Sequence, residues 1–301
     1  MRNIILFFSF VLLINCNREE LRAPQHYILS IPEIRLETNY AEEGTAYQRI
    51  NTVWVYVNDR PLGTFDMPAN INFSTAPGEV EVRMIAGVTQ NGISALRVEY
   101  PFFQTYRENI LIDPEQKTYY LNAANDSIPV VRYLTNANIF PIEDFENIGL
   151  SLQATSRSDV PLRRTVANDP NVFNSNIPGE PNQYSGYVRM VEGEILFEFE
   201  TVQEFSFPIG GSPVYAELNF NTNHPFSIGL ISTTNGGEIQ SGIIEVQPTG
   251  GAWRKVYVYY TDDVSNTPGT ISTRLFIGGI RQDADKEKDI RVYIDNFKVI
   301  F

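Results

Sequence analysis

Tyrosines that face away from a predicted core are the side chains of this sequence best suited to hold a ligand. Tyr257 and Tyr259 alternate with Val256 and Val258, so the valines face the core of a sheet and the tyrosines its other side. The same alternation predicts that the Tyr215 side chain also faces away from the core. Aromatic faces stack on sugar rings while nearby polar groups fix the hydroxyls. We therefore predict a ligand platform at these three tyrosines; the alternative is that they cover a second sheet or pack on another domain.

The loop-rich stretch 156–187 supplies two further candidates for ligand contact, Tyr184 and Tyr187. It has several proline and glycine turns, and aromatic side chains on loops are often accessible. We predict that both can contribute to the same kind of ligand site.

Catalytic chemistry finds little support in the residue types. The chain has two histidines, His26 and His224, and one cysteine, and it has no Gly-x-Ser-x-Gly elbow and no histidine pair with metal-ligand spacing. Two carboxylates would suffice for glycoside hydrolysis, but no pair stands out among the 36 acidic residues. We predict a protein without catalytic activity, with a glycoside-cleaving enzyme as the alternative.

Composition narrows the class of protein and its partners. The formal charge is −13 over 301 residues, which argues against binding to nucleic acid or to anionic lipid, because both need basic patches. Aromatic residues make up 12%, and prolines and glycines are frequent. No long stretch has 3.6-residue periodicity, so the sequence predicts an all-β protein.

The first residues read as a signal segment (residues 1–15) that ends at the only cysteine. An apolar run at residues 4–14 follows Arg2; it is shorter than the ~20 residues that a transmembrane helix needs. Leu13-Ile14-Asn15-Cys16 resembles the lipobox of bacterial lipoproteins, although Asn15 stands where Gly, Ala or Ser is usual. The resemblance implies lipidation of Cys16 with acyl chains such as palmitate; the alternative is an ordinary secretory signal with an unrelated cysteine.

Residues 16–26 are expected to form a polar, lipidated tether. Within it, Asn17-Arg18-Glu19-Glu20 resembles the surface-export signal of Bacteroidetes lipoproteins. That resemblance implies anchoring to the outer membrane with exposure on the cell surface; the alternative is a solvated tether without a signal.

Residues 27–123 have the pattern of a small β-sandwich. The stretch 53–57 (VWVYV) alternates cleanly, Asn58-Asp59-Arg60-Pro61 predicts a turn, and Asn91-Gly92 is a strong turn signal because both residues tolerate positive φ. Residues 53–65 (VWVYVNDRPLGTF) with Pro77-Gly78-Glu79-Val80 resemble PEGA-type, immunoglobulin-like surface domains. The resemblance implies a structural or adhesive module.

A linker is predicted at residues 124–137. Asp126-Ser127-Ile128 resembles the O-glycosylation motif of secreted Bacteroidetes proteins, which implies a glycan on Ser127. The alternative is a plain turn.

Residues 138–301 predict a second β-sandwich, a jelly roll of about eight antiparallel strands. The segments 252–258 (AWRKVYV), 274–278 (RLFIG) and 292–299 (VYIDNFKV) resemble the last strands of galactose-binding-like domains and carbohydrate-binding modules. The resemblance implies the fold more directly than the ligand, because function depends on sites that vary within a fold.

The same resemblance implies a structural Ca²⁺ as a cofactor. In those jelly rolls, acids of the first and last strands often share a calcium ion, and the matching residues here are Glu143, Asp144, Glu146 and Asp295. Calcium takes 6–8 oxygen ligands. The alternative is a hydrogen-bonded Asp295 at an irregularity of the last strand.

Together these patterns predict a lipid-anchored outer-membrane protein that binds glycan or mediates adhesion through its second domain. The alternative is a structural subunit of a cell-surface machine for gliding, secretion or nutrient uptake, in which both domains contact an outer-membrane protein partner.

Overall fold

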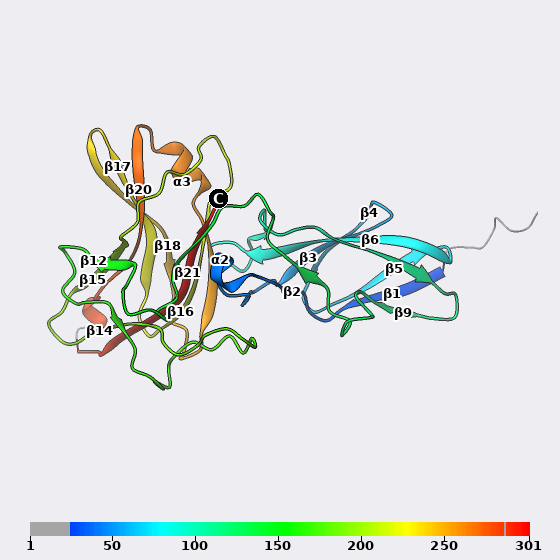
Figure 1. The fold of residues 1–301 in the computed structure, drawn as a ribbon, viewed down its shortest axis with the longest axis horizontal. Helices are drawn as coiled ribbons and strands as arrows, with labels where there is room; N and C mark the ends of the chain where they lie inside the picture. Colours follow the sequence, from blue (N-terminus) through cyan, green and yellow to red (C-terminus); the bar gives the residue numbers. More distant parts are fainter. Residues whose placement is uncertain (1–24, 286) are drawn as a thin grey trace, which may run out of the picture.

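The chain forms two β-sandwiches placed end to end (Figure 1). The computed structural model describes residues 25–301 except residue 286, so the predicted signal segment, Cys16 and most of the tether lie outside the described residues. Its helical segments are short: α2 (Tyr40–Glu43), α3 (Thr261–Asn266) and the 3₁₀ turn η2 (Asp283–Asp285). Within this described part, no helix has the length and apolarity needed to cross a membrane. The predicted all-β class is confirmed.

The first sandwich is built from ten strands. They are β1 (Gln25–Ile31), β2 (Arg35–Leu36), β3 (Thr52–Val57), β4 (Arg60–Asp66), β5 (Ala69–Thr75), β6 (Gly78–Thr89), β7 (Arg97–Glu99), β8 (Tyr106–Ile112), β9 (Thr118–Tyr120) and β10 (Val130–Val131). One sheet has the order β5-β1-β9, and the other has the order β4-β3-β6-β7 with β8 also paired to β6. β10 pairs with β2 in parallel.

The alternation of the sequence explains these strands. In β3, Val53 and Val55 are buried in the core while Trp54 is only partly buried. Asn58 and Asp59 connect β3 to β4 with positive φ at both residues, the geometry that a tight two-residue hairpin requires.

The second sandwich has the strand order of a jelly roll. Its strands are β11 (Ile139–Glu143), β12 (Leu152–Ala154), β13 (Arg163–Arg164), β14 (Gly186–Met190), β15 (Leu196–Thr201), β16 (Tyr215–Thr222), β17 (Phe226–Thr234), β18 (Gly237–Val246), β19 (Arg254–Tyr259), β20 (Thr270–Ile280) and β21 (Ile290–Ile300). One sheet, here called the junction sheet, has the order β13-β14-β21-β16-β19, with β11 on β21. The other, the outer sheet, has the order β12-β15-β20-β17-β18. From β14 to β21 the chain distributes its strands between the two sheets as a jelly roll does.

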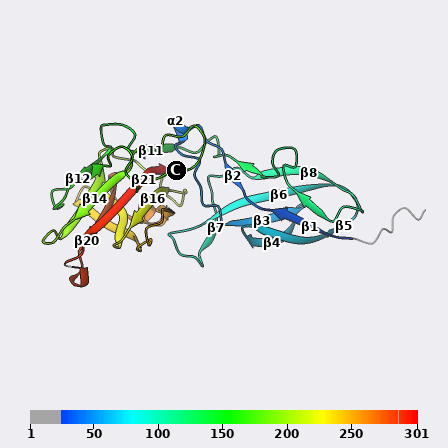
Figure 2. The same cartoon turned by 90° about the horizontal axis from the view of Figure 1, so that it is seen from below.

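The junction sheet packs against the end of the first sandwich, and the C-terminus lies at this junction (Figures 1 and 2). The segment predicted as a linker, residues 124–137, is packed against the first sandwich. It contains β10, and Val131 and Tyr133 are buried in the same apolar cluster as the first sandwich. The chain between the two sandwiches is therefore part of their packing.

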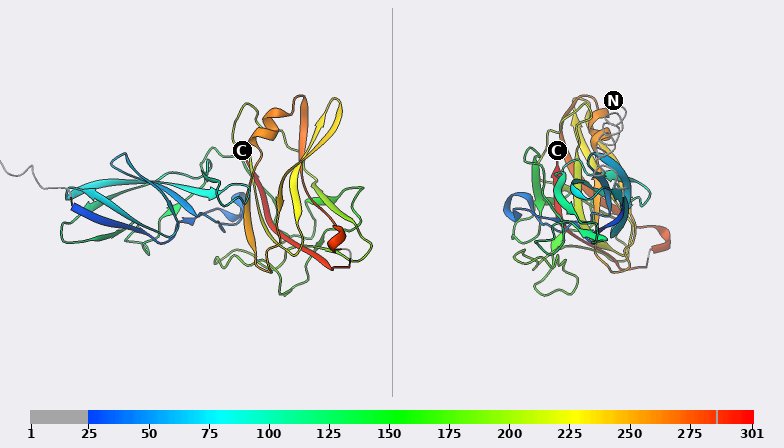
Figure 3. Two further views of the ribbon diagram at one scale, coloured as in Figure 1. Left: turned by 180° about the vertical axis from the view of Figure 1, so that it is seen from behind. Right: turned by 90° about the vertical axis from the view of Figure 1, so that its right-hand side faces the viewer.

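The molecule is elongated, and Figure 3 shows the two bodies from behind and from the end. β1 begins at Gln25, at the end of the first sandwich far from the jelly roll. The second sandwich therefore lies at the opposite end of the molecule from the first described residue.

Candidate functional site

The predicted tyrosine platform is the contact between the two sandwiches. Tyr257 and Tyr215 are only 2% and 4% exposed, and their rings pack edge to face on Tyr100 of the first sandwich. Tyr259 is partly buried and contacts the ring of Tyr215. These tyrosines face away from the jelly-roll core, as predicted, but a ligand cannot reach Tyr257 or Tyr215. The alternative interpretation, packing on the first domain, is the one observed.

A buried carboxylate, Glu217, organises this junction. Tyr100 and Tyr133 each donate a hydrogen bond of 2.9 Å to its Oε1, and Lys255 Nζ lies 2.6 Å from its Oε2. Burial acts to raise the pKa of Glu217, but the charges of Lys255 and Lys298 outweigh it and hold the pKa below its usual value. Burial raises the pKa of the Tyr100 and Tyr133 hydroxyls. The hydrogen bonds from Tyr100 and Tyr133 to the ionised Glu217 therefore join the two sandwiches.

The Asn91-Gly92 turn completes the junction. Both residues have positive φ, as predicted, and Asn91 N donates to the Tyr257 carbonyl oxygen at 2.8 Å. Asn91 Oδ1 accepts a hydrogen bond of 2.8 Å from Tyr259 N. The turn thus pairs with the edge strand β19, which protects that edge from other strands.

The two loop tyrosines differ in their surroundings. The guanidinium of Arg164 lies 3.3 Å from the centre of the partly buried Tyr184 ring and covers one face. Tyr187 is partly exposed on β14 and stacks on Tyr293 with 4.8 Å between ring centres. The structure does not bring either residue to the platform predicted around Tyr257.

The four predicted calcium ligands are occupied as hydrogen-bond acceptors. Asp295 accepts from the Ser185 hydroxyl and from Asn296 N, and burial raises its pKa well above the usual range. The other three accept from backbone or tyrosine donors: Glu143 from Phe145 N and Ser151 N, Asp144 from Tyr40 Oη and Glu146 N, and Glu146 from Gln183 N and Tyr184 N. Across residues 25–301, apart from 286, no three His, Cys, Asp or Glu side chains form a group that could hold a metal ion. These carboxylates are thus engaged with donors of the chain itself, and calcium binding stays a prediction.

Ser127 lies in the turn after Asn122, with positive φ and a partly exposed side chain. This setting is compatible with a glycan on its hydroxyl. Its O-glycosylation stays a prediction.

The jelly roll carries an open groove of about 580 Å³ on the solvent side of its outer sheet. Polar residues from four segments reach it: Arg157 from the loop after β12, Glu198 from β15, Ser227 from β17 and Gln240 from β18. Ligand sites in proteins are typically concave and about 300–1,000 Å³ in volume. This groove is the candidate functional site.

A charged network crosses the groove. The Arg157 guanidinium binds the Glu198 carboxylate through two nitrogens and also contacts Gln240 Oε1. Gln240 Nε2 and Thr155 Oγ1 each donate to Glu198 at 2.8 Å. Burial acts to raise the pKa of Glu198, but the hydrogen bonds from Arg157, Gln240 and Thr155 outweigh it and lower the pKa. Glu198 is therefore an ionised anchor that fixes Arg157 and Gln240 in place.

Glycines under this network create the depth of the groove. Gly278 lies beside Glu198 and Ser227 in the sheet, and Gly229 pairs with both Phe276 and Gly242. A Cβ on Gly229 would lie 2.6 Å from the Phe276 ring, whereas one on Gly242 would meet nothing within 4 Å. Since two strands separate β15 from β18, the hydrogen bond between Glu198 and Gln240 spans β20 and β17, where Gly278 adds no side chain. The sequence analysis missed this site, although glycines inside strands signal close approach of other groups.

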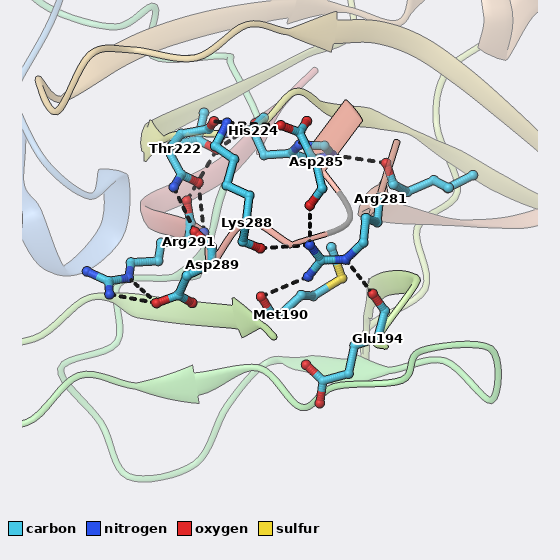
Figure 4. Close-up of polar contacts among 11 residues, drawn as sticks. Met190, Glu194, Thr222, His224, Arg281, Asp285, Lys288, Asp289 and Arg291 are labelled. Carbon is cyan, nitrogen blue, oxygen red and sulfur yellow. Dashed lines mark hydrogen bonds and ion pairs between the residues drawn. The ribbon is translucent and has the colours of Figure 1, made fainter. Parts of the chain in front are cut away.

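One end of the groove is fixed by the polar cluster of Figure 4. His224 is fully buried, with Nε2 2.9 Å from the Ile280 carbonyl oxygen and Nδ1 3.1 Å from Asp285 Oδ2. Arg281 donates to the carbonyl oxygens of Glu194 at 2.7 Å and Met190 at 3.0 Å. Both ring nitrogens of His224 are occupied, so its role is to hold the residues that line this end.

Comparison with known proteins gives similarity of fold only. No protein-family model matches the sequence, and no curated protein matches it closely enough to count as a relative. Among solved structures, the C-terminal family 22 carbohydrate-binding module of Clostridium thermocellum Xyn10B is 14% identical with a TM-score of 0.33, covering 52% of this chain and 90% of that one. The family 11 module of C. thermocellum Lic26A-Cel5E is 9% identical with a TM-score of 0.33, covering 54% and 93%.

A third similar structure is a carbohydrate-binding module of the β-sandwich superfamily described as promiscuous in specificity. It is 12% identical with a TM-score of 0.38, and the match covers 92% of this chain and 98% of that one. At these identities and TM-scores, what this chain binds has to be inferred from its own residues.

Proposed function

We propose that this chain is a non-catalytic protein that binds glycan in the groove of its outer sheet. The observation that carries the proposal is the network of Arg157, Glu198 and Gln240 above a glycine floor. Guanidinium and amide groups held in place by a buried anchor can hydrogen-bond sugar hydroxyls without losing much side-chain entropy. Ser227 and Gln282 add polar groups along the same groove.

A binding role suits the groove better than a catalytic one. Glu198 accepts hydrogen bonds from three side chains, and its pKa is lowered. A general acid would instead need a raised pKa. Glu198 is therefore better placed to position donors than to transfer a proton.

The surroundings of the groove agree with a surface-displayed module. We propose that Cys16 carries the lipid anchor and that the first sandwich is a spacer on the outer membrane. Gln25 and the jelly roll lie at opposite ends of the molecule (Figure 3), so an anchor before Gln25 would leave the groove far from the membrane.

The test is a glycan array with residues 21–301 and an Arg157→Ala/Gln240→Ala variant. We expect the wild type to bind a set of glycans and the variant to lose at least about tenfold in affinity, since hydrogen bonds to charged groups contribute about 1.5–3 kcal/mol each. The matched control is Arg163→Ala/Gln203→Ala, whose side chains are exposed in the same sandwich. Equal binding by all three proteins would contradict the groove as the site, and a folded wild type that binds no glycan would contradict the function.

A second candidate is a structural contact at the end of the jelly roll. Ile195, Ile280 and Val191 are 60%, 65% and 42% exposed, and they lie around Arg281, which links their strands. Clustered exposed apolar side chains mark protein contacts. If pull-down from intact outer membranes captures a protein that an Ile195→Ser/Ile280→Ser variant does not, this candidate gains over glycan binding.

A further inference from the structure

A second cavity lies between the two sandwiches and is made by both of them. It has a volume of about 340 Å³. Its walls are the segments around Arg49 and Asn91 in the first sandwich, and the end of β18 with the start of β19 in the second. We call it the junction cleft. Neither sandwich alone would form it.

The walls of the junction cleft are held in register by hydrogen bonds. Arg49 N donates a hydrogen bond of 3.0 Å to the Tyr257 hydroxyl oxygen, and Asn91 N donates to the Tyr257 carbonyl oxygen. Lys255 Nζ donates to the Tyr47 carbonyl oxygen at 2.9 Å. The cleft is thus preformed, so a ligand need not bring the sandwiches together.

Within the part of the chain that the structure describes, the side chains of two arginines in the cleft, Arg49 and Arg254, make no ion pair, hydrogen bond or ring contact. Most arginine side chains in the described chain make an ion pair, a hydrogen bond or a ring contact. The exceptions are Arg49, Arg60, Arg163 and Arg254, and two of these four, Arg49 and Arg254, line the junction cleft. Both side chains are exposed, so their guanidinium groups are open to a ligand in the cleft.

The remaining charged groups of the cleft reduce this positive charge but do not cancel it. Lys255 is neutralised by Glu217. Glu245 lines the opposite wall, and its carboxylate accepts a hydrogen bond of 3.0 Å from Gln247. Ser94 adds a hydroxyl to the lining. The cleft therefore combines two free guanidinium groups with neutral donors and one carboxylate.

We propose that the junction cleft binds the oxyanion of an acidic saccharide, a uronate carboxylate or a sulfate ester, between Arg49 and Arg254. Guanidinium groups bind such oxyanions through paired N–H donors, with stronger bonds than neutral donors make. That the anion belongs to a sugar rests on the proposed glycan-binding function. The site itself rests on the two arginines and the cavity.

The test is calorimetric titration of residues 21–301 with trigalacturonate, with a sulfated galactotriose and with neutral galactotriose. We expect the acidic ligands to bind more tightly than the neutral one, and to weaken between 50 and 300 mM salt (about a Debye length of 14 to 6 Å) because the arginines are solvent-accessible. Arg49→Ala/Arg254→Ala should lose at least about tenfold in affinity for the acidic ligand. The control Arg60→Ala/Arg163→Ala removes the same charge elsewhere and should keep the wild-type affinity.

The outcomes separate this inference from the proposed function. Acidic ligand bound equally by wild type and Arg49→Ala/Arg254→Ala overturns the junction cleft as the site, while glycan binding in the groove stands. A folded wild type that binds neutral glycan but not acidic glycan also overturns only the proposal for the junction cleft. No binding of any saccharide overturns the proposed function and the sugar in the cleft together.

Discussion

Lys298 carries an ammonium group that is buried at the junction, where it donates to the carbonyl oxygens of Glu43 and Thr45. Burial lowers its pKa to about 8, although the charge of Glu217 opposes the shift. A buried charge is costly unless its hydrogen bonds are satisfied. The ammonium group has three hydrogen-bond acceptors and lies near the carboxylate of Glu217. These groups keep Lys298 charged at neutral pH.

The pKa of Lys298 predicts a rise in stability with pH. An unfolded lysine titrates near 10.4. Between about 8 and that value the unfolded chain holds a proton that the folded chain lacks, so the free energy of unfolding increases with pH. Urea unfolding from pH 7.5 to 9.5 should show this increase in the wild type and in the exposed-lysine control Lys117→Met. If the free energy of unfolding of Lys298→Met increased with pH by the same amount, the pH dependence would not come from Lys298.

The hydrogen bonds of the acids predicted to bind calcium lead us to expect that calcium does not change the stability of the protein. Glu143 and Asp295 already accept hydrogen bonds from groups of the chain itself, so binding calcium would break them. We expect neither 5 mM CaCl₂ nor EDTA to shift the Tm by more than about 1 °C, because a ligand that binds only weakly adds little to RT ln(1 + [L]/Kd). Differential scanning fluorimetry measures the Tm. A clear decrease in Tm in EDTA would contradict this expectation and support the predicted calcium site.

At the level of elements, β17 and β18 carry a pair of glycines of which Gly242 lines the groove. Gly229 pairs with Gly242 across the two strands, yet the two positions differ in the space around them. A Cβ on Gly229 would lie 2.1 Å from the Ser241 carbonyl oxygen and against the Phe276 ring, whereas one on Gly242 meets open space. The close backbone approach at Gly229 leaves no room for a side chain there.

This difference predicts unequal effects of the same substitution. Gly229→Ala should lower the free energy of unfolding by about 1–3 kcal/mol, the usual cost of overpacking. Gly242→Ala should change the stability by less than about 0.5 kcal/mol. Urea unfolding of both variants measures the difference, and equal stability would contradict the close approach at Gly229.

Several elements could be predicted from the sequence, and the reason lies in local pattern. The alternation in β3 and the two turns at Asn58-Asp59 and Asn91-Gly92 depend on neighbouring residues alone, and they are confirmed. The alternation also placed Tyr257 on the correct side of its sheet. It could not show that Tyr100 covers that side, because contacts between distant segments leave no periodic signal. The groove was missed for the same reason: Arg157 and Gln240 are far apart in sequence.

At the scale of the whole molecule, the junction joins two sandwiches into one unit. The first sandwich's apolar cluster includes Tyr215, Tyr257 and Ile300 of the second, and the buried Glu217–Lys255 pair lies beside them. Interfaces within a chain usually allow domain motion unless they are large and apolar. Here a continuous buried cluster crosses the boundary, so the jelly roll should be held at a fixed angle to the first sandwich and the junction cleft should keep its shape.

Tyr257→Ala tests this coupling. The variant removes a ring that is 2% exposed and its contact with Tyr100, so we expect a loss of about 3–5 kcal/mol, as for other buried aromatic residues. Because the lost contacts lie between the sandwiches, calorimetry should show one unfolding transition in the wild type and two in the variant, and small-angle scattering should show a wider range of domain orientations. Tyr120→Ala, at a 45% exposed tyrosine of the first sandwich, should keep a single transition. A Tyr257→Ala protein that unfolds as one unit with wild-type scattering would mean that the sandwiches are coupled by other contacts, and that Tyr257 only fills space between them.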